Sequence, residues 1–141
     1  YYYHPYGYGL VSAVQDALGH LTRYEYNARG QVVRQFGDAT SPHRIVYDDY
    51  GRRKELHTFQ GGTNWNAATW PTANDAGANV TKWVYQEATG LLDYKEDSGA
   101  NRTTYTYHPT GQVHTRTGQR GVVTTYDYWP KTGELKSVVY S

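Results

Sequence analysis

Histidine is the side chain in this sequence with the widest chemistry, because an imidazole can bind a metal ion or move a proton. Zinc sites place such ligands in pairs a few residues apart, and no two histidines here stand at such a spacing. His4 and His108 each stand between a tyrosine and a proline, in two copies of one motif. We therefore expect structural or solvent-exposed roles and no bound metal for the six, which are His4, His20, His43, His57, His108 and His114.

Carboxylates and hydroxyls give no stronger catalytic pattern. Asp93, Glu96 and Asp97 lie close together, but they lack the Asp-x-Asp-x-Asp-Gly loop of a calcium site. None of the serines stands in a nucleophile elbow, and no pair of carboxylates is marked out for sugar hydrolysis. We expect no catalytic residue, no cofactor and no enzyme activity.

Two tryptophans have the composition around them that a binding site needs. Trp65 and Trp70 lie in a stretch rich in Asn, Thr and Gly, together with Asn64 and Asn66. These four residues are our candidates for a sugar or partner site, since long loops in compact domains often carry function. The alternative is that this stretch is a loop whose tryptophans cap an open side of a β-sheet.

The overall composition excludes several classes of protein. There is no Cys, so neither a disulfide nor a thiolate metal site forms. The net charge is +1 and the only dense basic group is Arg52-Arg53-Lys54, which argues against nucleic acid. No apolar run approaches the roughly 18 residues of a membrane span. Since the sequence holds no Met and opens on Tyr1, we expect a piece of a longer chain whose targeting signals lie elsewhere.

The chain is poor in aliphatic residues and rich in aromatic ones. Leu, Ile, Val and Phe make up only 22 of the 141 residues, whereas there are 16 Tyr and 4 Trp, which predicts a folded chain with a thin, wet core.

Glycine recurs at a fixed period along the chain. The glycine spacings are 21, 21, 39, 21 and 22, where the long one holds an insertion at about 60–78. Each glycine closes a short polar turn, and the six are Gly9, Gly30, Gly51, Gly90, Gly111 and Gly133.

Large residues precede these glycines in pairs two positions apart, which places both on one face of a β-strand. Around the turn at 27–30 we expect Tyr26 to lie opposite Val32 and Tyr24 opposite Arg34. In two repeats the turn is one residue longer, and a β-bulge is expected to absorb it. The structural residues of the repeat are Tyr24, Tyr26, Gly30, Tyr47, Gly51, Trp83, Tyr85, Gly90, Tyr105, Tyr107, Gly111, Tyr126, Tyr128 and Gly133.

A second set of turns closes each period, around 16–19, 37–42, 97–100 and 118–121. The runs between turns are rich in Thr, Val and Tyr, which favour strands. The prediction is an all-β antiparallel meander of eleven or twelve strands, two per repeat, forming a twisted ribbon over residues 1–141. It holds about six repeats and one insertion loop.

The stretches 26–32, 47–52 and 107–113 resemble the YD-repeat signature, Tyr-Asp-x-x-Gly-Arg-Leu, and 117–128 is similar to bacterial Rhs proteins. The signature belongs to Rhs proteins, the B and C components of insecticidal toxin complexes, and teneurins. The sequence departs from it at Asn27, Gln86, His108 and Trp129, where Asp is usual. No segment matches the autoproteolytic core that ends bacterial shells, so the resemblance assigns no cargo release to these residues.

The resemblance implies a segment of a hollow β-shell, and it leaves three functions open. The first is a structural wall of a secreted or surface bacterial protein, whose partners are neighbouring repeats of the same parent chain and an encapsulated toxin domain. The second is an extracellular carbohydrate-binding module that uses exposed Tyr and Trp. The third is a self-assembling β filament, built through unpaired strand edges.

Overall fold

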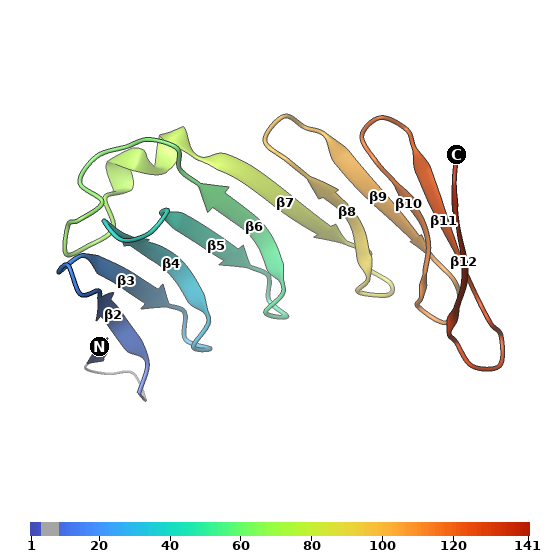
Figure 1. Cartoon of the computed structure of the whole chain (residues 1–141), viewed down its shortest axis with the longest axis horizontal. Coiled ribbons are helices and arrows are strands. Elements are labelled where there is room, and N and C mark those ends of the chain that lie inside the picture. Colours follow the sequence, from blue (N-terminus) through green and yellow to red (C-terminus); the bar gives the residue numbers. More distant parts are fainter. Residues whose placement is uncertain (4–8) are drawn as a thin grey trace. The chain divides into compact units, whose positions relative to one another are not determined.

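The computed structural model describes residues 1–3 and 9–141, and they form an antiparallel meander (Figure 1). The twelve described strands follow one another in sequence order within the sheet, so the all-β prediction is confirmed. They are β1 (Tyr2–Tyr3), β2 (Val11–Gln15), β3 (Leu21–Tyr26), β4 (Val32–Gly37), β5 (His43–Tyr47), β6 (Arg53–Thr58), β7 (Asn79–Tyr85), β8 (Leu92–Glu96), β9 (Arg102–Tyr107), β10 (Val113–Thr117), β11 (Val123–Tyr128) and β12 (Leu135–Tyr140).

The chain divides into two compact units, Tyr1–Val80 and Thr81–Ser141. Each unit is a run of hairpins whose strands pair with their neighbours in sequence. His4 and Pro5, which the sequence placed in a first copy of the motif, lie outside the described residues. Tyr2 and Tyr3 begin the meander by pairing with β2. No helix in the described part is long or apolar enough to cross a membrane.

Every hairpin closed by one of the six periodic glycines carries a register shift at the same position. In β3–β4, Tyr26 lies opposite Val32 as expected, but Glu25 lies opposite Arg34. Val33 is therefore the extra residue of a β-bulge, three positions after Gly30. Tyr24 consequently faces Gln35, and the prediction that it faces Arg34 was wrong, because a bulge slips the register by one residue.

The same one-residue slip recurs in the other hairpins of this kind. It falls three positions after the turn glycine each time, so that one residue on the returning strand is left unopposed. The bulge is thus a regular feature of the repeat rather than an irregularity of one hairpin. The unopposed residues are Ser12, Lys54, Asp93, His114 and Lys136.

The two longer turns keep their extra residue inside the turn, and the prediction that a bulge absorbs it was wrong. In the shorter turns the glycine N–H bonds to the carbonyl three residues back, as Gly30 does to Asn27 at 3.0 Å. In the longer ones it reaches four residues back, from Gly90 to Gln86 and from Gly133 to Trp129, at 2.8 Å each. A wider closing hydrogen bond accommodates the residue without moving the strands.

Positive φ falls on the last residue of the turns. Gly111 has a φ of 84° and Gly121 one of 78°. In the 97–100 turn this position is held by Ala100 at 60°, while Gly99 before it has no positive φ. An L-residue with a Cβ is strained in that region, so this turn stores strain that its neighbours lack.

The insertion at about 60–78 is not an unstructured loop. It contains a short 3₁₀ helix, η1 (Thr72–Gly77), and packs against the first unit. Phe36, Phe59 and Trp70 form the cluster of buried apolar side chains, with Trp65 and Ala78 partly buried beside them. Among residues 1–3 and 9–141, the other buried apolar side chains are Ala13 and Ile45. The thin core that the composition predicts is therefore concentrated beneath the insertion.

Substitutions at Ala100 and Gly111 should act in opposite directions. Ala100→Gly relieves the left-handed strain and is expected to raise the free energy of unfolding by about 0.5–1 kcal/mol. Gly111→Val should lower it by about 1–3 kcal/mol through backbone strain alone, because a Cβ at Gly111 would meet nothing within 4 Å. Urea unfolding of both variants measures this, and equal signs would contradict the turn assignment.

Candidate functional site

The paired aromatic residues of each unit share one face of the sheet. In the first unit Tyr24 lies opposite Gln35, which lies opposite His43 on the strand that carries Tyr47. Opposite residues of paired strands point to the same side, and residues two apart on one strand do so too. The three tyrosines Tyr24, Tyr26 and Tyr47 are thus on one side.

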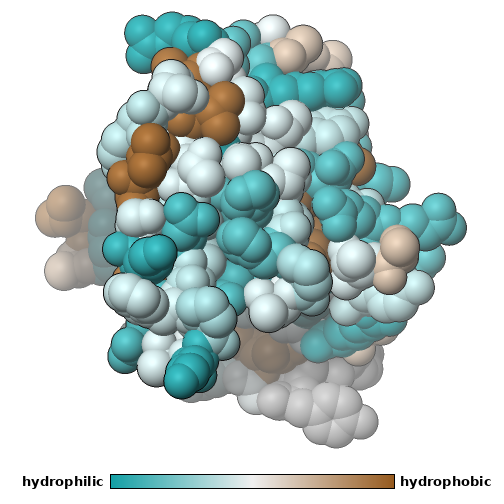
Figure 2. Space-filling view, turned by 90° about the vertical axis from the view of Figure 1, so that its right-hand side faces the viewer, coloured by the Kyte–Doolittle hydropathy of each residue, from teal (hydrophilic) through white to brown (hydrophobic). Residues whose placement is uncertain are grey.

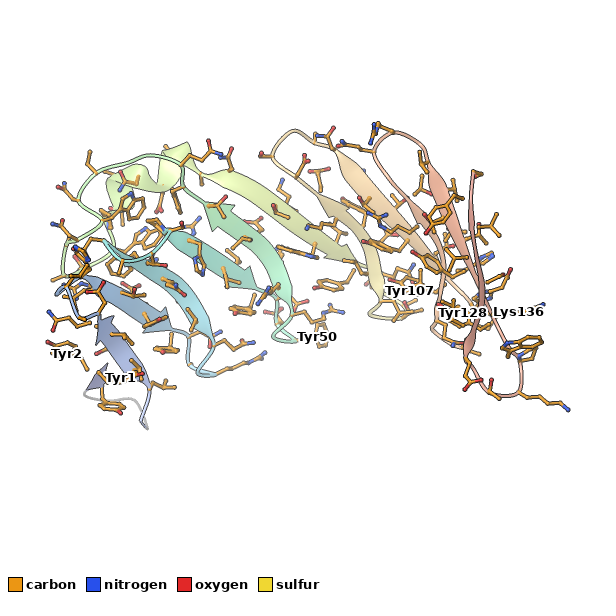
Figure 3. The ribbon with its side chains drawn as sticks, in the orientation of Figure 1. Tyr1, Tyr2, Tyr50, Tyr107, Tyr128 and Lys136 are labelled. Carbon is orange, nitrogen blue, oxygen red and sulfur yellow. The ribbon has the colours of Figure 1, made fainter. Side chains whose placement is uncertain are left out.

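The second unit repeats this arrangement. Tyr105 lies opposite Arg116, and Arg116 lies opposite Thr124, two residues before Tyr126. Tyr107 and Tyr128 follow on the same side, and Figure 3 labels both at the turn ends of their strands. The structure therefore brings together the aromatic residues of successive repeats within each unit.

Tyrosine hydroxyls connect one repeat to the preceding one. Tyr26 donates to the carbonyl of Val11 at 2.8 Å, Tyr47 to that of Val32 at 3.1 Å, and Tyr107 to that of Leu92 at 2.7 Å. In each case the acceptor lies 15 residues earlier and just after the turn of the previous hairpin. We call these three bonds the tyrosine ladder.

The tyrosine ladder supplies hydrogen-bond donors to carbonyls that lie beyond the end of the strand pairing. Between β4 and β5 the paired residues are only Arg34 with Arg44 and Gln35 with His43. Val32 lies beyond them, so its carbonyl has no strand partner from β5 in this register. A partly buried carbonyl without a partner destabilises the fold, and the Tyr47 hydroxyl supplies the missing donor.

Burial adjusts the acidity of these hydroxyls. Desolvation raises the pKa of Tyr26, and the neighbouring Tyr24 raises it further. Desolvation is also the largest cause that raises the pKa of Tyr107, which the hydrogen bond to Leu92 partly opposes. Both phenols thus remain protonated and able to donate at neutral pH.

The residue after the second tyrosine organises the turn. The side-chain oxygen of Asp48 accepts from the backbone N–H of Tyr50 at 3.0 Å and of Arg52 at 2.8 Å, and the Arg52 guanidinium donates to its other oxygen at 2.7 Å. Asn27 accepts the two equivalent backbone bonds in its own turn. The Asp of the YD signature is therefore replaceable by Asn here, since the turn needs an acceptor rather than a charge.

The charge of Asp48 still adds a pH dependence. Desolvation raises its pKa, but the bonds from the Arg52 backbone and side chain outweigh it and hold the pKa below the usual value. A carboxyl with a lowered pKa stabilises the folded state above its unfolded pKa, and this contribution is lost as the pH falls through the folded pKa.

Adjacent turns are linked side chain to backbone. Gln31 donates to the carbonyl of Gly51 at 2.9 Å, and Gln112 donates to that of Gly133 at 2.7 Å. Each donor directly follows its turn glycine and reaches the glycine of the next repeat. The residue after the glycine thus sets the distance between turns, a role that sequence periodicity could not assign.

The insertion covers the face opposite to the tyrosines of the first unit. Trp70 contacts Phe36, Phe59 and Trp65 with ring centroids 5.2–5.5 Å apart. Phe36 lies opposite Arg23, and both alternate with residues of the tyrosine face. Trp70 is thus buried against this face, with Trp65 partly buried beside it.

Polar contacts hold the insertion in place. The indole N–H of Trp70 donates to Asp75 at 2.9 Å, and the other oxygen of Asp75 lies 3.6 Å from Arg44. Arg23 donates from Nε to the carbonyl of Ala67 at 2.9 Å. Phe36, Phe59 and Asp75 were not predicted as partners of the tryptophans, because they lie outside the local pattern around them.

The four candidate ligand-binding residues have different surroundings. Trp70 is 5% exposed and its ring is enclosed by other aromatic rings. Trp65 is half-buried, and its N–H donates to the carbonyl of Gly61. Asn64 and Asn66 are exposed, and Asn64 has a left-handed φ of 61°. Only Trp65 and the two asparagines present surface to a ligand.

The remaining titratable side chains do not converge. Within residues 1–3 and 9–141 no group of three His or acidic side chains is placed to hold a metal ion. His57 is buried, between Glu55 at 2.8 Å and Arg44 at 3.2 Å. His108 and His114 lie with ring centroids 4.4 Å apart, beside Tyr128.

Comparison with solved structures identifies the fold. The chain is similar to the crystal structure of TcdB2-TccC3 without its hypervariable C-terminal region, with a TM-score of 0.53 and 18% identity over 91% of this chain and 8% of that one. TcdB2-TccC3-TEV gives 0.52 and 17% over the same shares. A structure of the Photorhabdus luminescens Tc holotoxin pore with a TccC3 mutation gives 0.35 and 13%, over 94% of this chain and 10% of that one, too low to carry an argument.

No family model and no curated protein matches the sequence. The chain spans less than a tenth of the two chains that share its fold. The resemblance to YD (Rhs) repeats is therefore confirmed at the level of the fold.

Removal of one hydroxyl tests the tyrosine ladder. Tyr47→Phe keeps the ring but leaves the Val32 carbonyl without its donor, and we expect the free energy of unfolding to fall by about 0.5–1.5 kcal/mol. Tyr50→Phe is the matched control, because Tyr50 is 83% exposed in the same repeat and should show no change. Urea unfolding measures both, and equal stability of the two variants would exclude a structural role for the bond.

Proposed function

We propose that the chain is a non-catalytic structural segment of a larger YD-repeat protein, one that is secreted or displayed on a bacterial surface. Its hairpins would form part of the wall of a β-shell or fibre that encloses a toxin, displays it, or contacts another cell. The observation that carries this proposal is that the turn, bulge and tyrosine bond recur at fixed positions. Such repetition supports a role that extends over many repeats rather than residing in one site.

The structural neighbours support the same role. TcdB2-TccC3 is a much longer chain in which a segment of this fold occurs. In the proposed function the immediate partners are neighbouring repeats of the parent chain, and an enclosed toxin domain is a further one. The polar side chains of the turns bond to the backbone or to adjacent turns, which accords with a structural rather than a catalytic use.

An in-phase deletion tests whether the repeats are interchangeable units. Removal of residues 91–111 joins Gly90 to Gln112, takes out β8 and β9, and leaves Val113 where Leu92 stood relative to the glycine. Because each repeat contacts mainly its neighbours, we expect the shortened chain to fold. Its circular dichroism per residue should match that of the full chain, and urea unfolding should remain cooperative.

An out-of-phase deletion is the control. Removal of residues 91–101 takes out β8 alone, so all later turns move to the opposite edge of the sheet and Tyr107 loses its acceptor. This variant should be less stable than the in-phase one although it loses fewer residues. If the in-phase variant were as unstable as this control, the proposed modular wall would be wrong.

Carbohydrate binding is a second candidate, favoured by the insertion. Trp65 offers part of its ring beside two exposed asparagines, and the left-handed Asn64 is the kind of strained residue that functional loops retain. A polysaccharide pull-down with the full chain tests it. Trp65→Ala should abolish binding, while Trp129→Ala, at a 52% exposed tryptophan of another turn, should not. If no glycan binds, the carbohydrate-binding proposal is wrong and only the structural role remains.

A further inference from the structure

A pocket of about 760 Å³ lies between two successive turns of the second unit. The turn after β7 contributes Gln86, Thr89 and Leu91, and Asp93 follows at the bulge. The strand β9 and its turn contribute the other wall, from Tyr105 to Gly111. Figure 3 shows Tyr107 at this turn end of β9. The pocket opens where the pairing of β8 with β9 has ended, which the tyrosine ladder spans.

The first unit has an equivalent pocket, which is lined by an arginine of the chain itself. It lies between the turns after β3 and β5 and measures about 390 Å³. Arg29 lines it and donates from its guanidinium to the carbonyl of Asp49, in the next turn, at 2.6 Å. The fold thus accommodates a guanidinium between consecutive turns.

Two differences at equivalent positions change the charged groups of the pocket in the second unit. The residue before the turn glycine is Arg29 in the first unit and Thr89 in the second. The bulge residue is Val33 in the first and Asp93 in the second. The second pocket has the carboxylate of Asp93 and no lysine or arginine among its lining residues, whereas Asp48 and Asp49 line the first pocket together with Arg29. The second pocket is also about twice as large.

The carboxylate of Asp93 has no close counter-charge. It is half-buried, and within the described part of the chain it has neither a hydrogen bond nor an ion pair. Arg102 acts on it only through longer-range attraction, since the Arg102 guanidinium donates to Glu96 at 2.6 Å and stacks on Tyr94 at 4.3 Å. A partly desolvated carboxylate attracts a cation more strongly than one in open water.

We infer that this pocket binds the guanidinium of an arginine side chain from a separate polypeptide segment, with Asp93 as its counter-ion. The carbonyl of Pro109 is the equivalent of the Asp49 carbonyl that Arg29 reaches. Tyr105 and Tyr107 line the same pocket, and a planar guanidinium packs well against aromatic rings. This goes beyond a purely structural wall, because it gives one junction between repeats a partner of defined chemistry.

Nuclear magnetic resonance titration of the full chain tests the inference with a minimal probe. N-acetyl-arginine amide should shift the amide resonances of residues around 86–93 and 105–111, with the weak affinity expected of a single side chain. N-acetyl-citrulline amide, which has nearly the same shape but no charge, should bind at least tenfold more weakly. Equal binding of the two compounds, or no shift with either, would overturn the inference without any variant.

Variants of the chain test whether the arginine probe binds in this pocket. Asp93→Asn should weaken binding of the arginine probe about tenfold, the loss expected for one charge-assisted hydrogen bond. Asp127→Asn is the matched control, because Asp127 is an exposed carboxylate on β11 of the same unit and lies outside the pocket. Thr89→Arg should place a guanidinium where Arg29 stands in the first unit, and so abolish binding.

Other outcomes of these experiments would contradict the inference. Unchanged affinity in Asp93→Asn, or an equal loss in Asp127→Asn, would mean that the probe binds the surface without this pocket. If soluble oligosaccharides shift the same resonances and the arginine probe does not, the pocket is a sugar site and the inference is wrong. The proposed structural function does not depend on this outcome, because the deletion experiment tests it separately.

Discussion

The hydrogen bond from a tyrosine hydroxyl to a carbonyl 15 residues earlier is the interaction on which the arrangement of successive repeats depends. The bulge after each turn slips the register, and the pairing between consecutive hairpins ends before it reaches the turn. The carbonyl exposed there requires a donor, and a tyrosine in the next hairpin has the length to supply one. This explains why an aromatic residue with a hydroxyl, rather than phenylalanine, stands there.

The low aliphatic content follows from the same design. Few of the described side chains in either unit are fully buried, so stability rests on backbone pairing, turn acceptors and cross-repeat bonds. The exception is the cluster beneath the insertion, where Phe36 is 1% exposed. Figure 2 shows the side of the molecule that holds β12, with hydrophobic side chains in small groups on a mostly polar or neutral surface. Val122, Leu135 and Val139 are exposed apolar residues of the second unit.

A repeated backbone gives different chemistry at equivalent positions. The residue that starts the turn is Asn27, Asp48 or His108, and the first two serve as acceptors while the third reaches the carbonyl of Tyr126. The bulge residue also differs from repeat to repeat, and no residue of the partner strand lies opposite to it. Functional variation can therefore accumulate there without loss of the fold, as the contrast between Val33 and Asp93 illustrates.

The sequence by itself determined the hairpins, the turn glycines and the common face of the tyrosines, because each depends on neighbours within a few residues. It did not determine the register beyond the first pair: a bulge leaves the alternation of residue types nearly intact while it moves Tyr24 from Arg34 to Gln35. Only the tertiary structure decided which carbonyl each hydroxyl reaches and whether Trp70 is buried. Those outcomes depend on residues far along the chain, and local periodicity carries no information about them.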